Sequence, residues 1–186
     1  MSEELLIRHC SPTLAGIKTG NLFSCKSRCR EEVIAHIRKF NALWQAKGLC
    51  ALLLRHRKGR ALIYVFRPHE LEMDLSSSEA KRLLAEMGYC CTKPWHCLAE
   101  LQCRLEKNKE FPHEIGLFLS YPPEDVAGFI NGSVPCKCAG CWKVYSDEKK
   151  ACLLFEKYRR CAHAYYRQWS RGVPFEHLIV TTKQKG

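Results

Sequence analysis

The sequence predicts an α+β fold in which a small, largely antiparallel sheet packs against several helices. Three observations support this fold class: apolar residues recur at helical spacing in several segments, two neighbouring apolar runs are separated by a short polar stretch, and helix-capping residues stand before the periodic segments. The 186 residues are 46% hydrophobic and 26% charged, with no linker-like tract. These values are typical of a globular chain and favour a single domain over residues 1–186.

The first helix is predicted over residues 28–47. Ser27 is the expected N-cap, and Gly48 follows the last helical residue as a stop signal. Apolar residues separated by four, three and four positions lie on one side of a helix, so they form a stripe that faces the core. The stripe consists of Val33, Ile37, Phe40 and Trp44.

An antiparallel hairpin is predicted next. Residues 49–54 and 61–66 are nearly continuous apolar runs, and the basic segment 55–60 lies between them. Continuous apolar runs favour strands that are covered on both faces. Pro68 is expected to end the second strand, because proline has no backbone N–H to donate to a neighbouring strand.

The central part of the chain is predicted to be mostly helical. Ser76 and Glu79 form a capping box, with Ser76 as the N-cap, before a helix that ends at Gly88. Residues 111–121 fit either a buried strand or a short helix, because periodicity does not separate the two. Further helices are predicted over residues 95–107 and 122–131.

The C-terminal part is predicted to contain a strand, a long helix and a second strand. Residues 142–145 alternate as in a strand, the long helix starts near residue 148, and residues 175–181 are the last strand. The core-facing stripe of the long helix is Ala151, Phe155, Tyr158, Ala162, Tyr165 and Trp169.

The net charge of +11 is concentrated in two blocks. Residues 28–67 carry ten Lys and Arg against two acids, and residues 126–186 carry eleven against four, whereas residues 68–125 are acidic. If the basic blocks share one face, an anionic small molecule or a nucleic acid is the expected partner. A solvated surface with a modest positive excess is the alternative. Tyr166 is the only ring of the last helix that is expected to face outward.

The N-terminus predicts a cytoplasmic protein. It lacks a basic leader followed by a long apolar run, so it is not a secretory signal. The longest purely apolar runs, residues 49–54 and 61–66, are far shorter than the ~20 residues that span a bilayer. The 13 cysteines are therefore expected to be reduced thiols.

Three closely spaced cysteines form the sharpest local pattern: Cys136, Cys138 and Cys141. Thiolates at this spacing can bind zinc or an iron–sulfur cluster, in a metal or redox protein. A structural zinc site needs a fourth ligand, and the alternative is that these thiols pack as small hydrophobic groups. The candidates for the fourth ligand are His113, Cys152 and the pair Cys90 and Cys91.

Residues 9–21 are rich in small, hydroxyl and glycine residues, which favours a loop that approaches a ligand closely. We expect a binding or accessory protein for a small anionic ligand or cofactor, held between this loop and the segment His113 and Glu114, with Lys18 as the charge partner. A structured loop over the core and an enzyme that uses Cys10 or His113 are alternatives. The predicted ligand-binding residues are His9, Cys10, Thr13, Lys18, His113 and Glu114.

Three segments together resemble an uncharacterised family of anaerobic bacteria, domain of unknown function 3793. They are residues 9–25 (HCSPTLAGIKTGNLFSC), 112–130 (PHEIGLFLSYPPEDVAGFI) and 142–147 (WKVYSD). The resemblance implies no activity and assigns no residue a role. It rests on the 9–21 segment and on His113 and Glu114 more than on the cysteines, so it favours the ligand site over the metal site.

Overall fold

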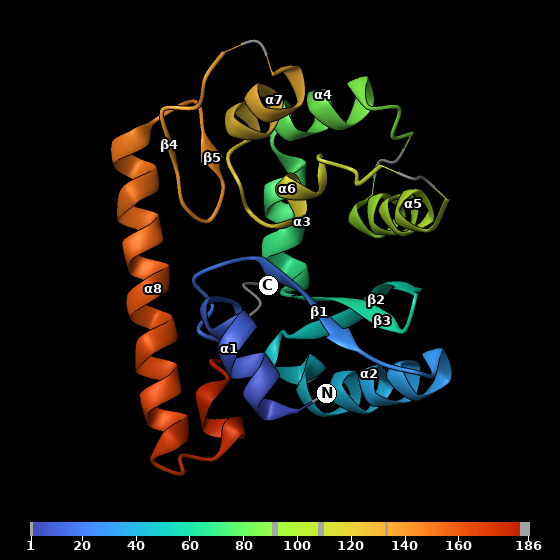
Figure 1. Cartoon of the computed structure of the whole chain (residues 1–186), viewed down its shortest axis with the longest axis vertical. Coiled ribbons are helices and arrows are strands. Elements are labelled where there is room, and N and C mark those ends of the chain that lie inside the picture. Colours follow the sequence, from blue (N-terminus) through green and yellow to red (C-terminus); the bar gives the residue numbers. More distant parts are fainter. Residues whose placement is uncertain (1, 91–92, 108–109, 133, 183–186) are drawn as a thin grey trace. The chain divides into compact units, whose positions relative to one another are not determined.

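The computed structural model describes residues 2–90, 93–107, 110–132 and 134–182. Contacts within the chain define two compact units: unit 1 is Met1–Glu70 with Cys161–Gly186, and unit 2 is Leu71–Arg160 (Figure 1). That the two units form a single domain stays a prediction.

Unit 1 is built on a three-stranded antiparallel sheet in the order β1-β3-β2 (Figure 1). β2 (Cys50–Arg57) and β3 (Arg60–Phe66) confirm the predicted hairpin, although the strands extend through most of the basic segment. The turn consists of Lys58 and Gly59, and both have the positive φ that tight hairpin turns require. β1 (Gly20–Lys26), which the sequence did not predict, pairs with β3.

One face of this sheet carries the core of unit 1. Phe23, Ile63 and Val65 point to that face and lie in one buried cluster with helical residues. The predicted apolar stripe of the first helix is part of the cluster, with three residues buried and Trp44 packed against it. The helical elements that contribute are α1 (Glu3–Leu14), α2 (Arg30–Trp44) and the 3-10 helix η2 (Phe175–Leu178).

The start of α2 differs from the prediction, and its end agrees with it. Cys29 occupies the N-cap position, and Ser27 instead donates its hydroxyl to the Cys29 carbonyl. The short 3-10 helix η1 (Gln45–Lys47) extends α2 to Gly48, which adopts the left-handed conformation expected of a stop signal.

Two predictions near the chain ends are wrong. Residues 9–21 are not one loop, because α1 continues to Leu14 and only residues 15–19 connect it to β1. Ser2 caps α1 and accepts a hydrogen bond from the Leu5 N–H, which starts the helix upstream of the proline-containing segment. Residues 175–181 do not form a strand, because Phe175–Leu178 is a 3-10 helix.

The chain between the two hairpins is helical. The predicted helix over 95–107 is confirmed, and the segment 111–121 contains a short helix rather than a strand. The capping residue of the helix after residue 76 is Ser77, whose hydroxyl accepts from the Ala80 N–H, so the assignment of Ser76 is wrong. The helices are α3 (Pro68–Ser76), which was not predicted, α4 (Ser78–Glu86), α5 (Pro94–Lys107), α6 (Ile115–Phe118) and α7 (Pro123–Asn131).

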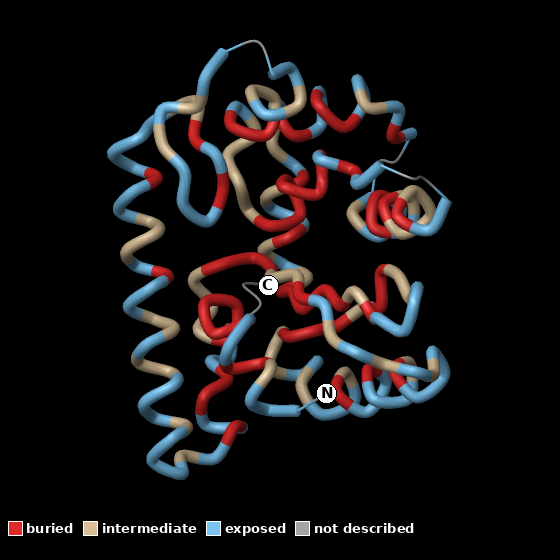
Figure 2. Tube along the Cα trace, viewed as in Figure 1, coloured by how far each residue is buried: buried red, intermediate tan, exposed pale blue. Residues whose placement is uncertain are grey.

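A second, small hairpin and a long helix complete the fold. The hairpin pairs β4 (Cys138–Ala139) with β5 (Lys143–Val144), which lies within the predicted strand over 142–145. α8 (Glu148–Ser170) confirms the predicted long helix. Most of α8 is exposed or half-buried, whereas Ala151 and Tyr158 of the predicted stripe are buried (Figure 2).

The described elements confirm the α+β class: eight α-helices, a three-stranded antiparallel sheet and a small hairpin. None of the helices in the described residues combines the length and apolar character that crossing a membrane requires.

Candidate functional sites

The hairpin end of the sheet in unit 1 presents four cations on one face. Lys26, Arg60 and Arg57 are direct partners across β1, β3 and β2. Arg55 lies two residues before Arg57 on β2, and it faces the same way because side chains alternate along a strand. This face is opposite to the one that carries Ile63 in the core. We call Lys26, Arg55, Arg57 and Arg60 the basic sheet end.

Among the described residues, no ion pair neutralises the basic sheet end. The three strands contain no aspartate or glutamate, and within the described parts of the chain none of the four cations forms an ion pair. Arg60 donates only to Ser24, to its hydroxyl at 3.1 Å and its carbonyl at 3.5 Å. Lys26, Arg57 and Arg60 are exposed. Like charges directly opposite each other destabilise a sheet, so this arrangement has an electrostatic cost.

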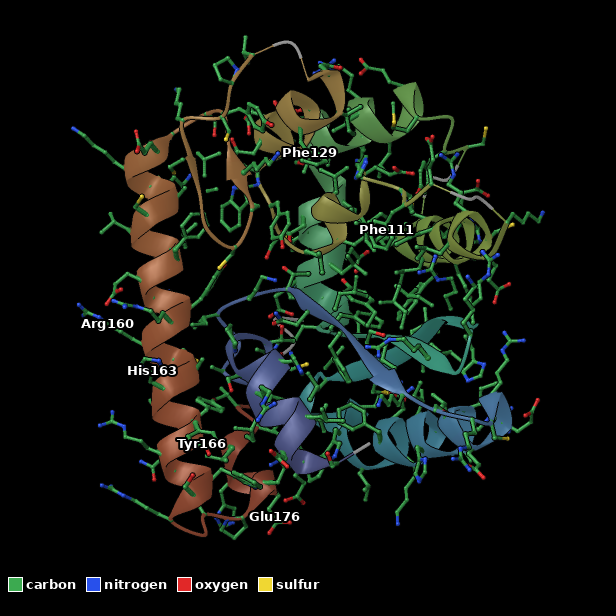
Figure 3. The ribbon with its side chains drawn as sticks, viewed as in Figure 1. Phe111, Phe129, Arg160, His163, Tyr166 and Glu176 are labelled. Carbon is green, nitrogen blue, oxygen red and sulfur yellow. The ribbon has the colours of Figure 1, made fainter. Side chains whose placement is uncertain are left out.

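Some basic residues of α8, unlike those of the basic sheet end, form ion pairs with an acid. Arg159 and Arg160 both pair with Glu156, and the distance from Arg160 Nε to the carboxylate is 2.6 Å. Tyr166, as predicted, is exposed, with 54% of its surface accessible, and it projects from α8 in Figure 3. A basic and aromatic surface on α8 therefore has fewer unpaired cations than the sequence suggested.

The predicted ligand residues on α1 are mostly occupied by packing. His9 stacks on Phe23 with ring centroids 5.4 Å apart. Cys10 is fully buried, and burial raises the pKa of its thiol, against the opposing effect of the Lys18 charge. A buried thiol with a raised pKa is a poor nucleophile, which argues against an enzyme that uses Cys10. Thr13 is buried and donates its hydroxyl to Asn21 Oδ1 at 2.7 Å.

Lys18 is buried in the short connection between α1 and β1. The residue is 7% exposed, and its ammonium group donates to the Gly20 carbonyl at 2.7 Å. An ammonium group in a low-dielectric site attracts an anion more strongly than one in water. The role of Lys18 as the charge partner of a ligand stays a prediction.

His113 and Glu114 belong to unit 2 and face different surroundings. The exposed His113 ring meets Phe129 edge-on, with centroids 4.8 Å apart; Phe129 is labelled in Figure 3. Glu114 is buried, accepts a hydrogen bond from the Tyr89 hydroxyl at 3.0 Å and pairs with Arg104 at 3.3 Å. Burial first, and then the Glu114 charge, raise the pKa of Tyr89. The other four predicted ligand residues lie in unit 1, so the predicted pairing of the two segments stays a prediction.

The cysteines of the small hairpin have separate neighbours. Cys138 Sγ lies 4.0 Å from Cys152 Sγ, and a Glu148 carboxylate oxygen completes a group whose atoms all lie within 4.8 Å of one another. Partial burial and the neighbouring Cys152, Glu148 and Cys136 raise the pKa of the Cys138 thiol. The Cys141 backbone carbonyl instead accepts a hydrogen bond from the Tyr121 hydroxyl at 3.1 Å.

Among the predicted candidates for the fourth ligand, Cys152 lies beside Cys138 and His113 does not join this group. Cys152 joins Cys138, as one of the predicted alternatives proposed, while His113 contacts Phe129. Cys91 lies outside the described residues. Glu148 was missed, although its spacing of four residues from Cys152 at the start of a predicted helix was a usable signal. Cys97 is disulfide-bonded, so the expectation of reduced thiols is wrong for this residue.

A family model matches residues 6–179, which is nearly the whole chain; its description is "Protein of unknown function (DUF3793)". The chain belongs to this family. The match confirms the resemblance that the three sequence segments indicated, and DUF3793 as described carries no activity that could be assigned to the residues above. No curated protein and no solved structure matches this DUF3793 chain at a significant level.

Proposed function

We propose that this protein binds a phosphate-bearing anionic partner through the basic sheet end, and that the partner is the backbone of a nucleic acid. The observation that carries the proposal is the row of Lys26, Arg60 and Arg57 across three adjacent strands, in which none of the three cations forms an ion pair within the described residues. A partner with closely spaced phosphates would offset the repulsion within this row, because each phosphate neutralises a cation and releases bound counterions.

A different explanation for cations on a sheet is protection of its edges. Charged side chains on edge strands discourage pairing with another chain, and both β1 and β2 are edge strands. This explanation accounts for Lys26 and Arg57. It does not account for Arg60, because β3 is the central strand and has no free edge.

Contact with the backbone is favoured over contact with bases. Base stacking requires exposed aromatic rings, and the aromatic residues of the three strands, Phe23, Tyr64 and Phe66, are all buried. Four cations contacting phosphates predict binding with little sequence preference and a strong dependence on salt.

The first test is duplex DNA of mixed sequence, labelled with a fluorophore and followed by anisotropy at several salt concentrations. With four phosphate contacts we expect log K to fall against log salt with a slope of about −3.6. The association constant should therefore drop about a hundredfold between 50 and 200 mM salt. Absence of binding at 50 mM salt would contradict the proposal.

A charge-matched pair of variants locates the surface. The double variant Arg57→Gln with Arg60→Gln removes two contacts, so the slope should weaken to about −1.8. The control is Arg38→Gln with Lys39→Gln, which removes the same charge from exposed positions of α2 in the same unit. An equal loss of binding in both variants would show that net charge, and not the basic sheet end, drives the association.

A small anionic ligand held by Lys18 is the second candidate, supported by the buried ammonium group between α1 and β1. It predicts saturable, one-to-one binding of pyrophosphate by calorimetry, with a loss of about tenfold or more in affinity in Lys18→Met. Arg57→Gln with Arg60→Gln should leave this binding unchanged. Pyrophosphate affinity that instead follows the Arg57 and Arg60 variants would assign the small anion to the basic sheet end.

A further inference from the structure

The small hairpin of unit 2 holds Cys138 in a fixed position beside α8. The Lys137 N–H donates to the Val144 carbonyl at 2.7 Å, and the Gly140 N–H donates to Trp142 at 3.0 Å, which closes the turn. The Trp142 ring meets Phe155 of α8 edge-on at 4.6 Å. A Cβ on Gly140 would overlap the ring of Phe155, so a residue without a side chain is needed for this close packing.

α8 supplies two more ligand atoms to the same place. Glu148 and Cys152 are four residues apart, so they lie on the same side of the helix in consecutive turns. Both are exposed, whereas Cys138 is half-buried, so an ion from solution can reach the group. Two thiols and a carboxylate from two separate elements therefore converge within 4.8 Å.

The spacing of the group fits zinc. Zinc–sulfur bonds of ~2.3 Å in a tetrahedral site place two sulfur atoms about 3.8 Å apart, and the Cys138 and Cys152 sulfurs are 4.0 Å apart. This separation is far longer than the ~2.05 Å of a disulfide bond. Thiolate ligands also favour zinc over calcium or magnesium, which bind oxygen ligands.

The fourth ligand has to come from outside this group of three, and Cys136 is the cysteine nearest to Cys138 in the sequence. It lies two residues before Cys138, in the segment that leads into β4. The Lys137 N–H between them donates to the Val144 carbonyl of β5, and the chain bends at Lys137 before β4 begins at Cys138.

We propose that Cys138, Cys152 and Glu148, with Cys136 as the fourth ligand, bind one zinc ion that fastens the β4–β5 hairpin to the start of α8. A set of three thiolates and one carboxylate fills all four tetrahedral positions, so the site is structural rather than catalytic. The sequence predicted the ligands Cys136, Cys138 and Cys141. In the proposed site, Cys152 and Glu148 take the place of Cys141.

The test uses the full chain, purified under reducing, oxygen-free conditions and stripped of metal with a chelator. Zinc is then titrated in competition with a chromophoric chelator, and cobalt is substituted to report thiolate ligation by its charge-transfer absorption. We expect one zinc per chain and a cobalt spectrum typical of a tetrahedral thiolate site. A protein that binds no stoichiometric zinc, or whose Cys138 and Cys152 only form a disulfide on mild oxidation, would overturn the proposal.

Variants that each lack one thiol test whether Cys152 or Cys141 is a zinc ligand. Cys152→Ser is expected to reduce zinc affinity about a hundredfold, and because Cys152 is exposed the apo variant should keep its circular dichroism spectrum. Cys141→Ser is the matched control and should keep the affinity within a factor of about three. Loss of affinity in Cys141→Ser, with little change in Cys152→Ser, would overturn the assignment of the ligands.

Discussion

Replacing Arg67 by methionine is expected to lower the free energy of unfolding by about 4 kcal/mol, because it leaves several buried acceptors without a donor. Arg67 is fully buried in unit 1, at 0% exposure. Burial lowers the pKa of its guanidinium group, because a charged group is less stable away from water. An arginine remains charged even so. All five of its N–H groups are used, toward the carbonyls of Thr13, Leu14, Lys47 and Val180 and the Thr182 hydroxyl, at 2.7–3.3 Å.

The position of these acceptors explains why a buried cation is tolerated. Thr13 and Leu14 end α1, and the free carbonyls at a helix C-terminus carry partial negative charge. Arg67 thus neutralises the end of α1 and at the same time holds the segment around Val180 against it. The guanidinium fork, and not only its charge, is required to reach acceptors on three sides.

Urea unfolding of three variants tests this role. Arg67→Lys should recover only a small part of the loss, because a lysine ammonium has three donors and no planar fork. Arg38→Met, at an exposed position of α2, is the control and should change the free energy by less than about 0.5 kcal/mol. A cost below about 1 kcal/mol for Arg67→Met would contradict the structural role.

Arg67 also shows which part of the fold the sequence could not predict. The hairpin β2–β3 and the helices α2, α5, α7 and α8 follow from local periodicity and capping, so they were predictable. Arg67 counted only as one charge of a basic block, because its acceptors lie between 20 and 115 residues away along the chain. Such non-local contacts leave no spacing signal in a single sequence.

In the candidate sites, too, the local sequence patterns were predictable and the non-local contacts were not. The basic sheet end was visible as a basic hairpin, but only the strand register places Lys26 beside Arg60. The cysteine trio was visible by spacing, but the turn at Gly140 and the approach of α8 select the neighbours of Cys138. α1 was missed because the small and hydroxyl residues of its C-terminal half were interpreted as part of a loop, whereas they lie in the last turns of α1.

Replacing Asp125 by alanine is expected to lower the free energy of unfolding by about 3 kcal/mol. Asp125 lies in the first turn of α7 and is only 2% exposed. Its carboxylate accepts from Trp142 Nε1 and from the N–H groups of Tyr145 and Ser146, each at 2.7 Å. Alanine would leave the buried Trp142 donor and the two half-buried N–H donors unpaired, and it would weaken the attachment of the small hairpin to α7.

The same contacts predict how stability depends on pH. Burial alone would raise the pKa of Asp125, but the hydrogen bonds from Tyr145, Trp142 and Ser146 outweigh burial and hold the pKa below its ordinary value. A lowered folded-state pKa means that the stabilisation is fully present above the unfolded carboxyl pKa of about 3.9. It is lost as the pH falls through the lower, folded-state pKa.

Comparison of the wild type with Asp125→Asn therefore separates charge from packing. Asparagine keeps the size of the side chain but has no carboxylate, so it lacks the stabilisation that the ionised Asp125 provides. The difference in the free energy of unfolding between the two proteins should therefore be largest near pH 7 and should shrink below about pH 4. Urea unfolding at pH 7 and pH 3 measures the difference, with exposed Glu72→Gln as the control. A difference that stays constant between these pH values would show that Asp125 stabilises the hairpin by shape alone, without its charge.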